Sequence, residues 1–476
     1  MSLAKCTIPR PVQLVIDDVG WREGWDLSAE GGPFRSGVER LLGPADYAAV
    51  ADLGELLGVR PQCAMILCEW DQENLCARHP TTTHAGTDWD NSSRMGDWTA
   101  ESADVFRTRS ANIEFAMHGV GHEHWENGAR TRAEWLGGSP AERWSRTILE
   151  GHLDCFRGLL AQHGLDPASG VSLPKSFVPC AFRFLWNNSD ADSTGALMTA
   201  AGVRYASTPF RTCCFVDDTP MRPDGGLEHG ILILDRGHSG IPWQVWDTIP
   251  ERPTPNAICG THWPNLLRPD PDENDLSIGR WHNYLAAVQE DSDTMLARNM
   301  ADTCSQWLHS QYTRLEKTAE DEWAIDETAI PSRCMELALV QPVIVKSPLS
   351  TGALHARKGR VTARWRAGDW MHTAVRTEGG QAVLTTSDST VQPHVHTAGT
   401  CDVLDVQERP DGLILALRVY GRQTIVMDAV STPSNVLALG PKVTLEQTTY
   451  CPDTQTLSLL LSTTDIQGAQ TEIRVQ

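Results

Sequence analysis

Residues 13–20 read QLVIDDVG, and this short stretch decides the fold that we expect for the first part of the chain. Gln13 to Ile16 form a mainly apolar run, typical of a buried strand. The run ends in two adjacent carboxylates, Asp17 and Asp18. Parallel α/β folds place functional side chains at the carboxyl ends of their strands. We therefore interpret this pair as a candidate site, the alternative being an ordinary turn or helix cap, where Asp is also common.

Strand-like and helix-like segments alternate after this stretch. Further strands are expected at Cys63–Leu67, Ile113–Met117, Lys175–Val178, Ile231–Leu234 and Ala257–Cys259. Helices are expected at Pro44–Leu57 with Gly58 as the stop, from Ser139 (with Pro140 and Glu142 in the first turn) to Gly164, and at Ser193–Ala201, Glu273–Gln289 and Ser292–His309. This rhythm predicts an α/β fold, with a parallel sheet and covering helices in the form of a (β/α) barrel.

The pattern changes after about Pro331. Period-two alternation and Thr/Val-rich runs dominate there, separated by Gly, Pro and Asp turns. We therefore predict two domains, a barrel at 1–331 and a smaller all-β sandwich or barrel at 332–476.

A long polar insertion interrupts the barrel near residues 70–98. A loop of this length inside a compact domain is usually functional or mobile. It carries two histidines and three tryptophans, which a mere spacer would not need: His79, His84, Trp70, Trp89 and Trp98. Two interpretations stay open: a lid that folds over the site and narrows it toward a small or end-on sugar, or a decoration on the outside of the barrel.

Charge and composition exclude some classes of protein. The net charge of −21 and the absence of Lys/Arg runs argue against nucleic acid as a partner. No segment approaches the ~20 apolar residues of a membrane span. The start, MSLAKCTIPRPVQLVIDD, lacks the apolar core of a signal peptide, so we expect a cytoplasmic protein or one whose leader has been removed. The 13 Cys include no CxxC pair, which suits buried thiols better than disulfides or a zinc ribbon. The 17 Trp suit stacking on sugar rings, although a core role is the more common one.

Histidines follow two of the expected strands. In FAMHGVGHEHW (residues 115–125), His118 and His122 have the i, i+4 spacing that brings two imidazoles together on one metal ion. His124 is a possible further ligand or supporting partner, but a surface position is more common. In AICGTHWPNLL (residues 257–267), His262 ends an apolar run and is a candidate general acid or a structural histidine.

Together these segments resemble the polysaccharide deacetylase family, the NodB-type carbohydrate esterases, over roughly residues 10–310. The resemblance implies that Asp17 is the catalytic base, that Asp18, His118 and His122 bind the metal, and that His262 is the catalytic acid. SFVPCAFRFLWNN (residues 176–188) resembles a third motif of distant members. The substrate-contact residues that follow from this comparison are Pro179, Trp186, Asn187, Trp263 and Asp247.

Several features depart from that family. Gly119 stands where a Ser or Thr is usual, and the gap from Asp18 to His118 is about twice the usual one because of the insertion. The expected Arg-x-Pro order is missing, since Arg183 follows Pro179. ILDRGHSGIPWQVWDTIP (residues 233–250) takes the place of a fourth motif, in which Asp235 or Asp247 is expected to orient His262.

The function expected from these motifs is metal-dependent removal of acetyl groups from an N-acetylated sugar. Zinc suits the N2O ligand set, and cobalt, nickel or iron would also bind. One alternative is a glycosidase or O-esterase on the same barrel; glycosidases need two opposed carboxylates, and no convincing second acid is seen. Another is a carbohydrate-binding protein with a vestigial metal site and recognition by the β domain. His394 and His396 form a weaker candidate metal pair, without an evident acidic partner.

Overall fold

The computed structural model describes residues 6–137, 143–210, 214–215, 226–237, 240–386, 393–429 and 431–476. The chain divides into two compact units, Gln13–Tyr284 and the residues up to Val12 together with Leu285–Gln476. Each unit is described by itself. No helix among the described residues is both long enough and apolar enough to cross a membrane.

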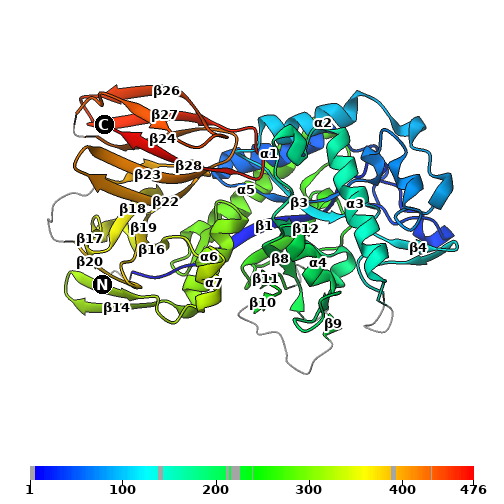
Figure 1. The fold of residues 1–476 in the computed structure, drawn as a ribbon, viewed down its shortest axis with the longest axis horizontal. Helices are drawn as coiled ribbons and strands as arrows, with labels where there is room; N and C mark the ends of the chain where they lie inside the picture. Colours follow the sequence, from blue (N-terminus) through cyan, green and yellow to red (C-terminus); the bar gives the residue numbers. More distant parts are fainter. Residues whose placement is uncertain are drawn as a thin grey trace. The chain divides into compact units, whose positions relative to one another are not determined.

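The unit formed by Gln13–Tyr284 is built on one curled sheet (Figure 1). Along the sheet the strands follow the order β10-β11-β8-β6-β3-β2-β1-β12, and all neighbours from β11 to β12 are parallel. Their bounds are β1 (Arg10–Val19), β2 (Gln62–Ile66), β3 (Glu114–Gly119), β6 (Ser176–Phe177), β8 (Tyr205–Thr208), β10 (Gly226–Glu228), β11 (Ile231–Asp235) and β12 (Ile258–His262).

The expected α/β class is therefore correct, but a closed barrel is not seen. Strand β10 pairs antiparallel with β11 and ends one edge of the sheet, and β12 ends the other. Among the described strands no pairing joins these two edges. The sheet is a curled half-barrel, in which β12 returns to the side of β1.

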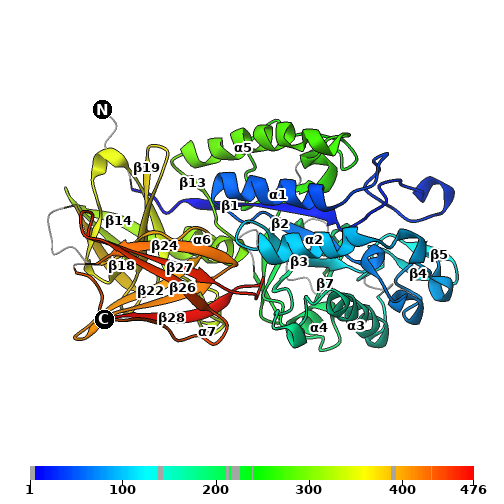
Figure 2. The ribbon, with the colours of Figure 1, turned by 90° about the horizontal axis from the view of Figure 1, so that it is seen from above.

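Helices cover this sheet, with α1 and α2 beside β1 to β3 (Figure 2). Their bounds are α1 (Pro44–Leu57), α2 (Asp97–Thr108), α3 (Arg146–Gln162), α4 (Thr194–Ala200) and α5 (Asn274–Glu290). Gly58 ends α1 in the left-handed conformation, as expected. Helix α3 begins later than expected, because Ser145 caps it; residues 143–145 are not helical, and Ser139, Pro140 and Glu142 lie outside the described residues.

Short 3-10 turns and strand pairs complete this unit. The turns are η1 (Ser28–Glu30), η2 (Cys68–Trp70), η3 (Leu75–Arg78), η4 (Gly86–Asp88), η5 (Ser92–Arg94), η7 (Pro167–Ser169), η8 (Cys180–Phe182), η10 (Trp263–Leu266) and η11 (Pro271–Glu273). The strand pairs are β4 (His124–Glu126) with β5 (Ala129–Thr131), and β7 (Leu185–Trp186) with β9 (Cys214–Phe215).

The insertion is a packed segment and not an open loop. Its turns η2 to η5 surround the carboxylate of Asp71, which accepts hydrogen bonds from the Cys76 amide at 2.8 Å and from Trp89 Nε1 at 3.2 Å. Gln162 of α3 donates to the same carboxylate at 3.1 Å. The tryptophans of the insertion, Trp70, Trp89 and Trp98, are all buried, so they serve as core residues.

The other unit is mainly β. Three sheets have the orders β14-β15-β20-β17, β16-β19-β18-β21-β24-β27-β26 and β22-β23-β28-β25. The strands are β13 (Thr294–Leu296), β14 (Arg314–Ala319), β15 (Glu322–Asp326), β16 (Val343–Pro348), β17 (His355–Lys358), β18 (Arg360–Ala367), β19 (Trp370–Arg376), β20 (Gln381–Thr385), β21 (Val395–Thr397), β22 (Asp402–Arg409), β23 (Gly412–Val419), β24 (Arg422–Asp428), β25 (Val436–Ala438), β26 (Thr444–Cys451), β27 (Thr456–Ser462) and β28 (Ala469–Val475). The strands of these three sheets thus begin at Arg314, and short helical segments stand at α7 (Ser332–Glu336) and η12 (Leu349–Thr351).

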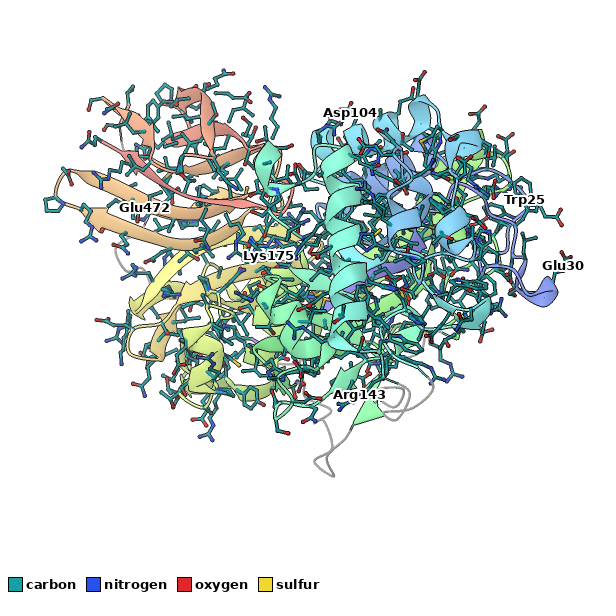
Figure 3. The ribbon with its side chains drawn as sticks, turned by 45° about the vertical axis from the view of Figure 1, so that its right-hand side comes forward. Trp25, Glu30, Asp104, Arg143, Lys175 and Glu472 are labelled. Atoms are coloured by element: carbon teal, nitrogen blue, oxygen red, sulfur yellow. The ribbon has the colours of Figure 1, made fainter. Side chains whose placement is uncertain are left out.

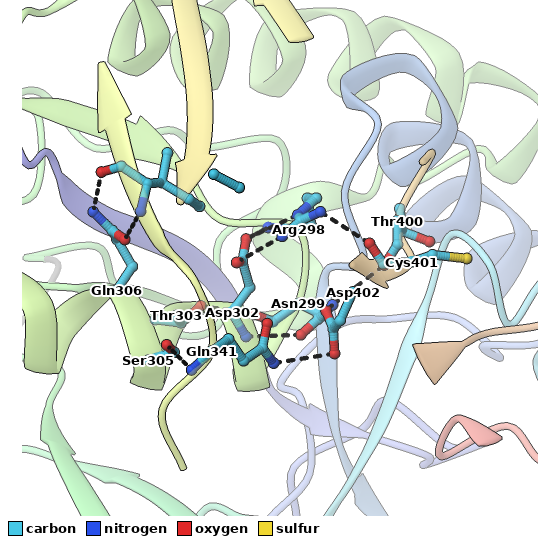
Figure 4. Close-up of polar contacts among 12 residues, drawn as sticks. Arg298, Asn299, Asp302, Thr303, Ser305, Gln306, Gln341, Thr400, Cys401 and Asp402 are labelled. Carbon is cyan, nitrogen blue, oxygen red and sulfur yellow. Dashed lines mark hydrogen bonds and ion pairs between the residues drawn. The ribbon is translucent and has the colours of Figure 1, made fainter. Parts of the chain in front are cut away.

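Helix α6 (Met300–Tyr312) belongs to this β-rich unit. The expected start at Ser292 is wrong, because Thr294–Leu296 form strand β13 and Asn299 caps the helix. Arg298 pairs with Asp302 at 2.9 Å and donates to the Cys401 carbonyl, and Asn299 donates to Asp402 at 2.7 Å (Figure 4). These buried polar contacts fix α6 against the strands of its own unit.

Candidate metal centre

A β-bulge separates the two aspartates at the end of β1. The register of β1 against β2 advances three residues from Ile16 to Val19 while β2 advances only two. Asp18 lies inside this bulge with a positive φ of 60°. An extra residue in a strand re-aims the neighbouring side chains. Asp17 and Asp18 can therefore take different partners although they are adjacent.

The two histidines reach the site from β3 and the loop after it. His118 lies at a second bulge, where Met117 pairs with Met65 and Gly119 pairs with Ile66. His122 follows in the left-handed conformation, with φ of 70°. The two histidines thus come from the end of a strand and the loop after it. They do not lie on one helical turn, which is the usual setting of the i, i+4 spacing.

Asp18 lies close to both His118 and His122. Asp18 Oδ1 lies 3.2 Å from His118 Nε2 and 3.6 Å from His122 Nε2. His118 Nδ1 contacts the Val178 carbonyl at 2.6 Å, so it carries the proton and leaves Nε2 free as a ligand. His122 Nδ1 is buried and has no partner among the described residues. Both imidazoles and the carboxylate therefore suit a divalent cation in an N2O set.

Cys180 is a rival third ligand. His118, His122 and Cys180 form a group whose ligand atoms lie within 4.8 Å of one another. Burial raises the pKa of the Cys180 thiol well above its ordinary value, and Sγ contacts the His118 carbonyl at 3.2 Å. Only a thiolate is a good metal ligand. Asp18 is therefore the better third donor.

The charges of the cluster depend on one another. Burial by itself would raise the pKa of Asp18, but the imidazoles of His122, His118 and His262 hold it well below its usual value. Burial lowers the pKa of His122 to about 3, so this imidazole is neutral and its nitrogen lone pairs are available. For His118, burial opposes the charge, but the hydrogen bond and the charge of Asp18 raise its pKa.

Asp17 is held by an arginine that the motifs did not reveal. Arg236, just after β11, places Nη1 at 2.7 and 2.6 Å from the two carboxylate oxygens of Asp17. Both side chains are buried, and Phe182 lies 4.7 Å from the guanidinium. The guanidinium occupies the space beside Gly260, where a Cβ would lie 2.0 Å from Nη2. A partner 219 residues away leaves no local pattern in the sequence.

His262 lies beside the aspartates because β12 is paired with β1. The register places His262 opposite Asp17, and His262 Nε2 lies 3.9 Å from Asp18 Oδ2. Burial lowers the pKa of His262, an effect that Asp18 and Asp17 partly offset. Its Nδ1 has no partner within the described part of the chain.

Neither expected carboxylate orients His262. Asp247 pairs with Arg268 at 3.2 Å and with Arg280 at 3.0 Å. Asp235 accepts from the backbone of Phe210 and Gly237. Both carboxylates are thus held by partners other than His262, and contact of Asp247 with substrate stays a prediction.

The other proposed contact residues divide into buried and undescribed ones. Trp263 is fully buried against Tyr47 at a ring distance of 4.7 Å, so it offers no surface to a substrate. Pro179 is buried before η8, and Asn187 holds a turn by accepting from Ser189. The side chain of Trp186 lies outside the described part of the structure. Arg183 donates to the Gly137 carbonyl at 3.2 Å, so it does not take the place of Arg236.

Three other histidines of the first unit that the sequence singled out, His124, His84 and His79, have their described contacts outside the cluster. His124 is buried and not at the surface as expected, because its ring stacks on Trp144 at 3.8 Å. His84 contacts Trp89 and Trp125 at ring distances of 6.0 Å. His79 packs near α3, with its Nδ1 3.5 Å from the position that a Cβ on Gly151 would take, and its carbonyl accepts from the Thr82 hydroxyl at 2.7 Å.

In the β-rich unit, Asp428 completes a second histidine cluster. His394 Nδ1 lies 2.8 Å and His396 Nε2 2.5 Å from its carboxylate. The acid comes from β24, which is paired with β21, and so it was not visible in the local sequence. Arg364 Nη1 lies 3.3 Å from His394 Nε2 and needs an acceptor there, which leaves the Nδ1 proton on the side of Asp428. That arrangement suits a hydrogen-bonded network better than a metal site.

Comparison with known proteins adds only distant similarity. No family model matches the chain, and no curated protein matches it. A structure described as a "putative polysaccharide deacetylase" from Mycobacterium smegmatis is 14% identical, with 61% of this chain and 76% of that chain covered and a TM-score of 0.29. A family 4 acetyl xylan esterase from Clostridium thermocellum, in complex with a cobalt ion, is 14% identical, with 45% and 77% covered and a TM-score of 0.18. Scores this low carry no argument about this chain, so the function has to be argued from its own residues.

Proposed function

We propose that this chain is a metal-dependent hydrolase that removes acetyl groups from an N-acetylated carbohydrate. The observation that carries the proposal is the closeness of Asp18 to both His118 and His122 beside an Asp17–Arg236 pair. A bound divalent ion would lower the pKa of a water molecule and polarise the acyl carbonyl.

The protein's own residues supply the proton transfers. Asp17 lies next to a ligand without being one, so its carboxylate is free to take the proton of the attacking water. Arg236 donates to both oxygens of this carboxylate and so fixes its orientation. His262 faces the same site from the neighbouring strand and donates a proton to the departing amine, which cannot leave as an anion.

An exposed tryptophan supports a carbohydrate as the substrate class. Trp25 is 45% exposed and is the only tryptophan among the exposed large apolar side chains of the described residues. Figure 3 shows it with Glu30 on the loop that follows β1. Loops after the strands of such sheets line the functional face. An indole there is suited to stack on the apolar face of a sugar ring.

A glycosidase or O-esterase is the second candidate. Two carboxylates opposed across a glycosidic bond are needed for the first, whereas Asp17 and Asp18 are neighbours at the end of one strand. Ester cleavage needs no protonation of an amine, so its rate would not depend on His262 to the same extent. The site therefore favours amide cleavage.

The test is acetate release by the full-length protein after chelation and after addition of Co²⁺ or Zn²⁺. The substrates are N-acetylglucosamine oligomers of increasing length and an O-acetylated xylan oligomer, with new reducing ends measured in parallel. The proposal predicts metal-dependent acetate from the N-acetylated series without new reducing ends. Reducing ends without acetate would show a glycosidase, and no product with any of them would favour a binding protein.

A further inference from the structure

The loop that carries His122 is held by one buried carboxylate, Glu134. This side chain has no exposure, and it accepts from three successive backbone amides of the loop. The distances are 2.9 Å from Val120, 3.2 Å from Gly121 and 2.9 Å from His122. Three amides aimed at one carboxylate form a cradle of the kind that binds anions.

Gly119 makes room for this carboxylate. A Cβ at position 119 would lie 2.1 Å from Glu134 Oε2 and 2.8 Å from its Cδ. Real Cβ atoms do not approach so closely, so any side chain at position 119 would displace the carboxylate from the amides. The glycine between the two histidines and the distant glutamate are thus matched to each other.

The side chains of His152 and Thr81 extend the hydrogen bonds of Glu134 away from the site. His152 of α3 donates from Nδ1 to Glu134 Oε1 at 3.0 Å, and its Nε2 lies 2.8 Å from the Thr81 hydroxyl. With the proton on Nδ1, the second nitrogen accepts from Thr81. Thr81 belongs to the insertion, and its carbonyl accepts from the amide of Trp125 at 2.9 Å. All three side chains are partly or fully buried.

We propose that Glu134 is a positioning residue of the metal centre, and that His152 and Thr81 link it to the insertion. This inference rests on the proposed metal site. Glu134 touches none of the three donor atoms; it sets the backbone of the loop and thereby the direction of the His122 imidazole. The insertion then acts on the site from behind the ligand loop, by way of Thr81.

The test is Co²⁺ binding to the metal-free full-length protein, measured by calorimetry, with thermal unfolding of the same samples. Glu134→Gln keeps the shape but cannot accept from all the donors, so the Kd should rise by about 10–100-fold, as for other groups that support ligands. The matched control is Glu114→Gln. Glu114 is also buried and stands at the other end of β3, where it accepts from Gln62 at 3.2 Å. It should lose stability but keep the wild-type Kd.

A second pair of variants keeps the inference testable if Glu134→Gln folds poorly. Gly119→Ala should weaken Co²⁺ binding in the wild-type background, because its Cβ displaces the carboxylate. The same change should have a smaller further effect in Glu134→Ala, where Cys180 Sγ, 2.9 Å from the added Cβ, is the neighbour that remains. Thr81→Val removes one hydroxyl and should raise the Kd only a few-fold.

Three results would overturn the inference. Wild-type Kd in Glu134→Gln would do so, as would equal losses in Glu134→Gln and Glu114→Gln, or additive effects of the Gly119 and Glu134 changes. If the wild-type protein itself bound no Co²⁺, the metal site of the proposed function would fail as well, and the two failures are thereby told apart.

Discussion

At the level of single residues, the proposed site depends on two adjacent aspartates that have different surroundings. The bulge in β1 gives Asp17 to Arg236 and Asp18 to the histidines. In the proposed mechanism, the first carboxylate takes a proton and the second binds the metal. The resemblance to the deacetylase motifs implied this division of roles, but the sequence did not reveal the bulge that separates the two side chains.

Asp17→Asn tests the proton-transfer role. The amide oxygen can still accept from Arg236, so the fold and Co²⁺ binding should be retained. The carboxylate that takes the proton is lost, and kcat should fall by ~10²–10⁴-fold. The control is Asp235→Asn, at the end of β11, whose contacts are with backbone amides. A wild-type kcat for Asp17→Asn would exclude Asp17 as the base.

His262→Ala tests the general acid. Protonated imidazole is needed to donate to the amine, so activity should decline as the pH rises through its pKa. In the variant, kcat should fall by ~10²-fold or more and the alkaline limb of the pH profile should become flat. Release of acetate from an O-acetylated substrate should be affected less. An unchanged alkaline limb would assign it to another group.

The residues that sequence reasoning missed share one property. Arg236, Glu134 and Asp428 act through partners outside their own local segments, at separations of 219 residues for Arg236–Asp17, 32 for His396–Asp428 and 14 for Val120–Glu134. Asp17, His118 and His262 could be proposed from the sequence because each ends an apolar run, which is a local signal. The buried Trp263 shows the reverse error, in which proximity to a motif suggested a role that packing excludes.

At the scale of elements, local signals predicted helices better than their exact starts. Helix α1 runs from Pro44 to Leu57 as expected, because proline and glycine mark both ends. The start of α6 was predicted too early. Residues before it form strand β13 because they pair with Arg10–Val12, and the whole unit Gln13–Tyr284 lies between these two segments in the sequence. The curl of the sheet and its open edges are properties of pairing, which the strand pattern does not contain.

We expect the loop after β1 to contact the substrate. Trp25 is exposed on it, while the tryptophans of the insertion are buried. If the indole stacks on a sugar ring, Trp25→Ala should raise KM several-fold and leave kcat nearly unchanged, because the contact is with a remote part of the substrate. Exposed Leu41→Ala on the same loop is the control. An unchanged KM on every chain length would remove Trp25 from substrate binding.

At the scale of the whole molecule, buried neutral histidines make stability depend on pH. His372 is 1% exposed and stacks on Trp365 at 5.3 Å, and burial together with Lys346 and Arg298 lowers its pKa to about 3. Unfolded chains bind this proton below about pH 6.5, whereas the folded protein excludes it until about pH 3. Stability is therefore complete above pH 6.5 and is lost as the pH falls toward 3, by about 2 kcal/mol at pH 5 for this residue.

His372→Leu should reduce this acid sensitivity. In metal-free protein, the drop in Tm between pH 7 and pH 5 should be smaller for the variant than for the wild type. His282→Leu on α5, which is only half-buried, should keep the wild-type slope. Equal slopes for all three proteins would show that His372 takes up its proton in the folded state at an ordinary pH.

The proposed function requires a bound metal ion, so the number of ions bound per chain is the most informative measurement. After reconstitution with Zn²⁺ or Co²⁺ and removal of excess ion, mass spectrometry of the metal should give about one ion per wild-type chain. His118→Ala/His122→Ala should hold almost none, while His394→Gln/His396→Gln should hold as much as the wild type. Stoichiometric metal in the His118→Ala/His122→Ala variant, or loss of metal in the His394→Gln/His396→Gln variant, would show that His118 and His122 do not hold the ion.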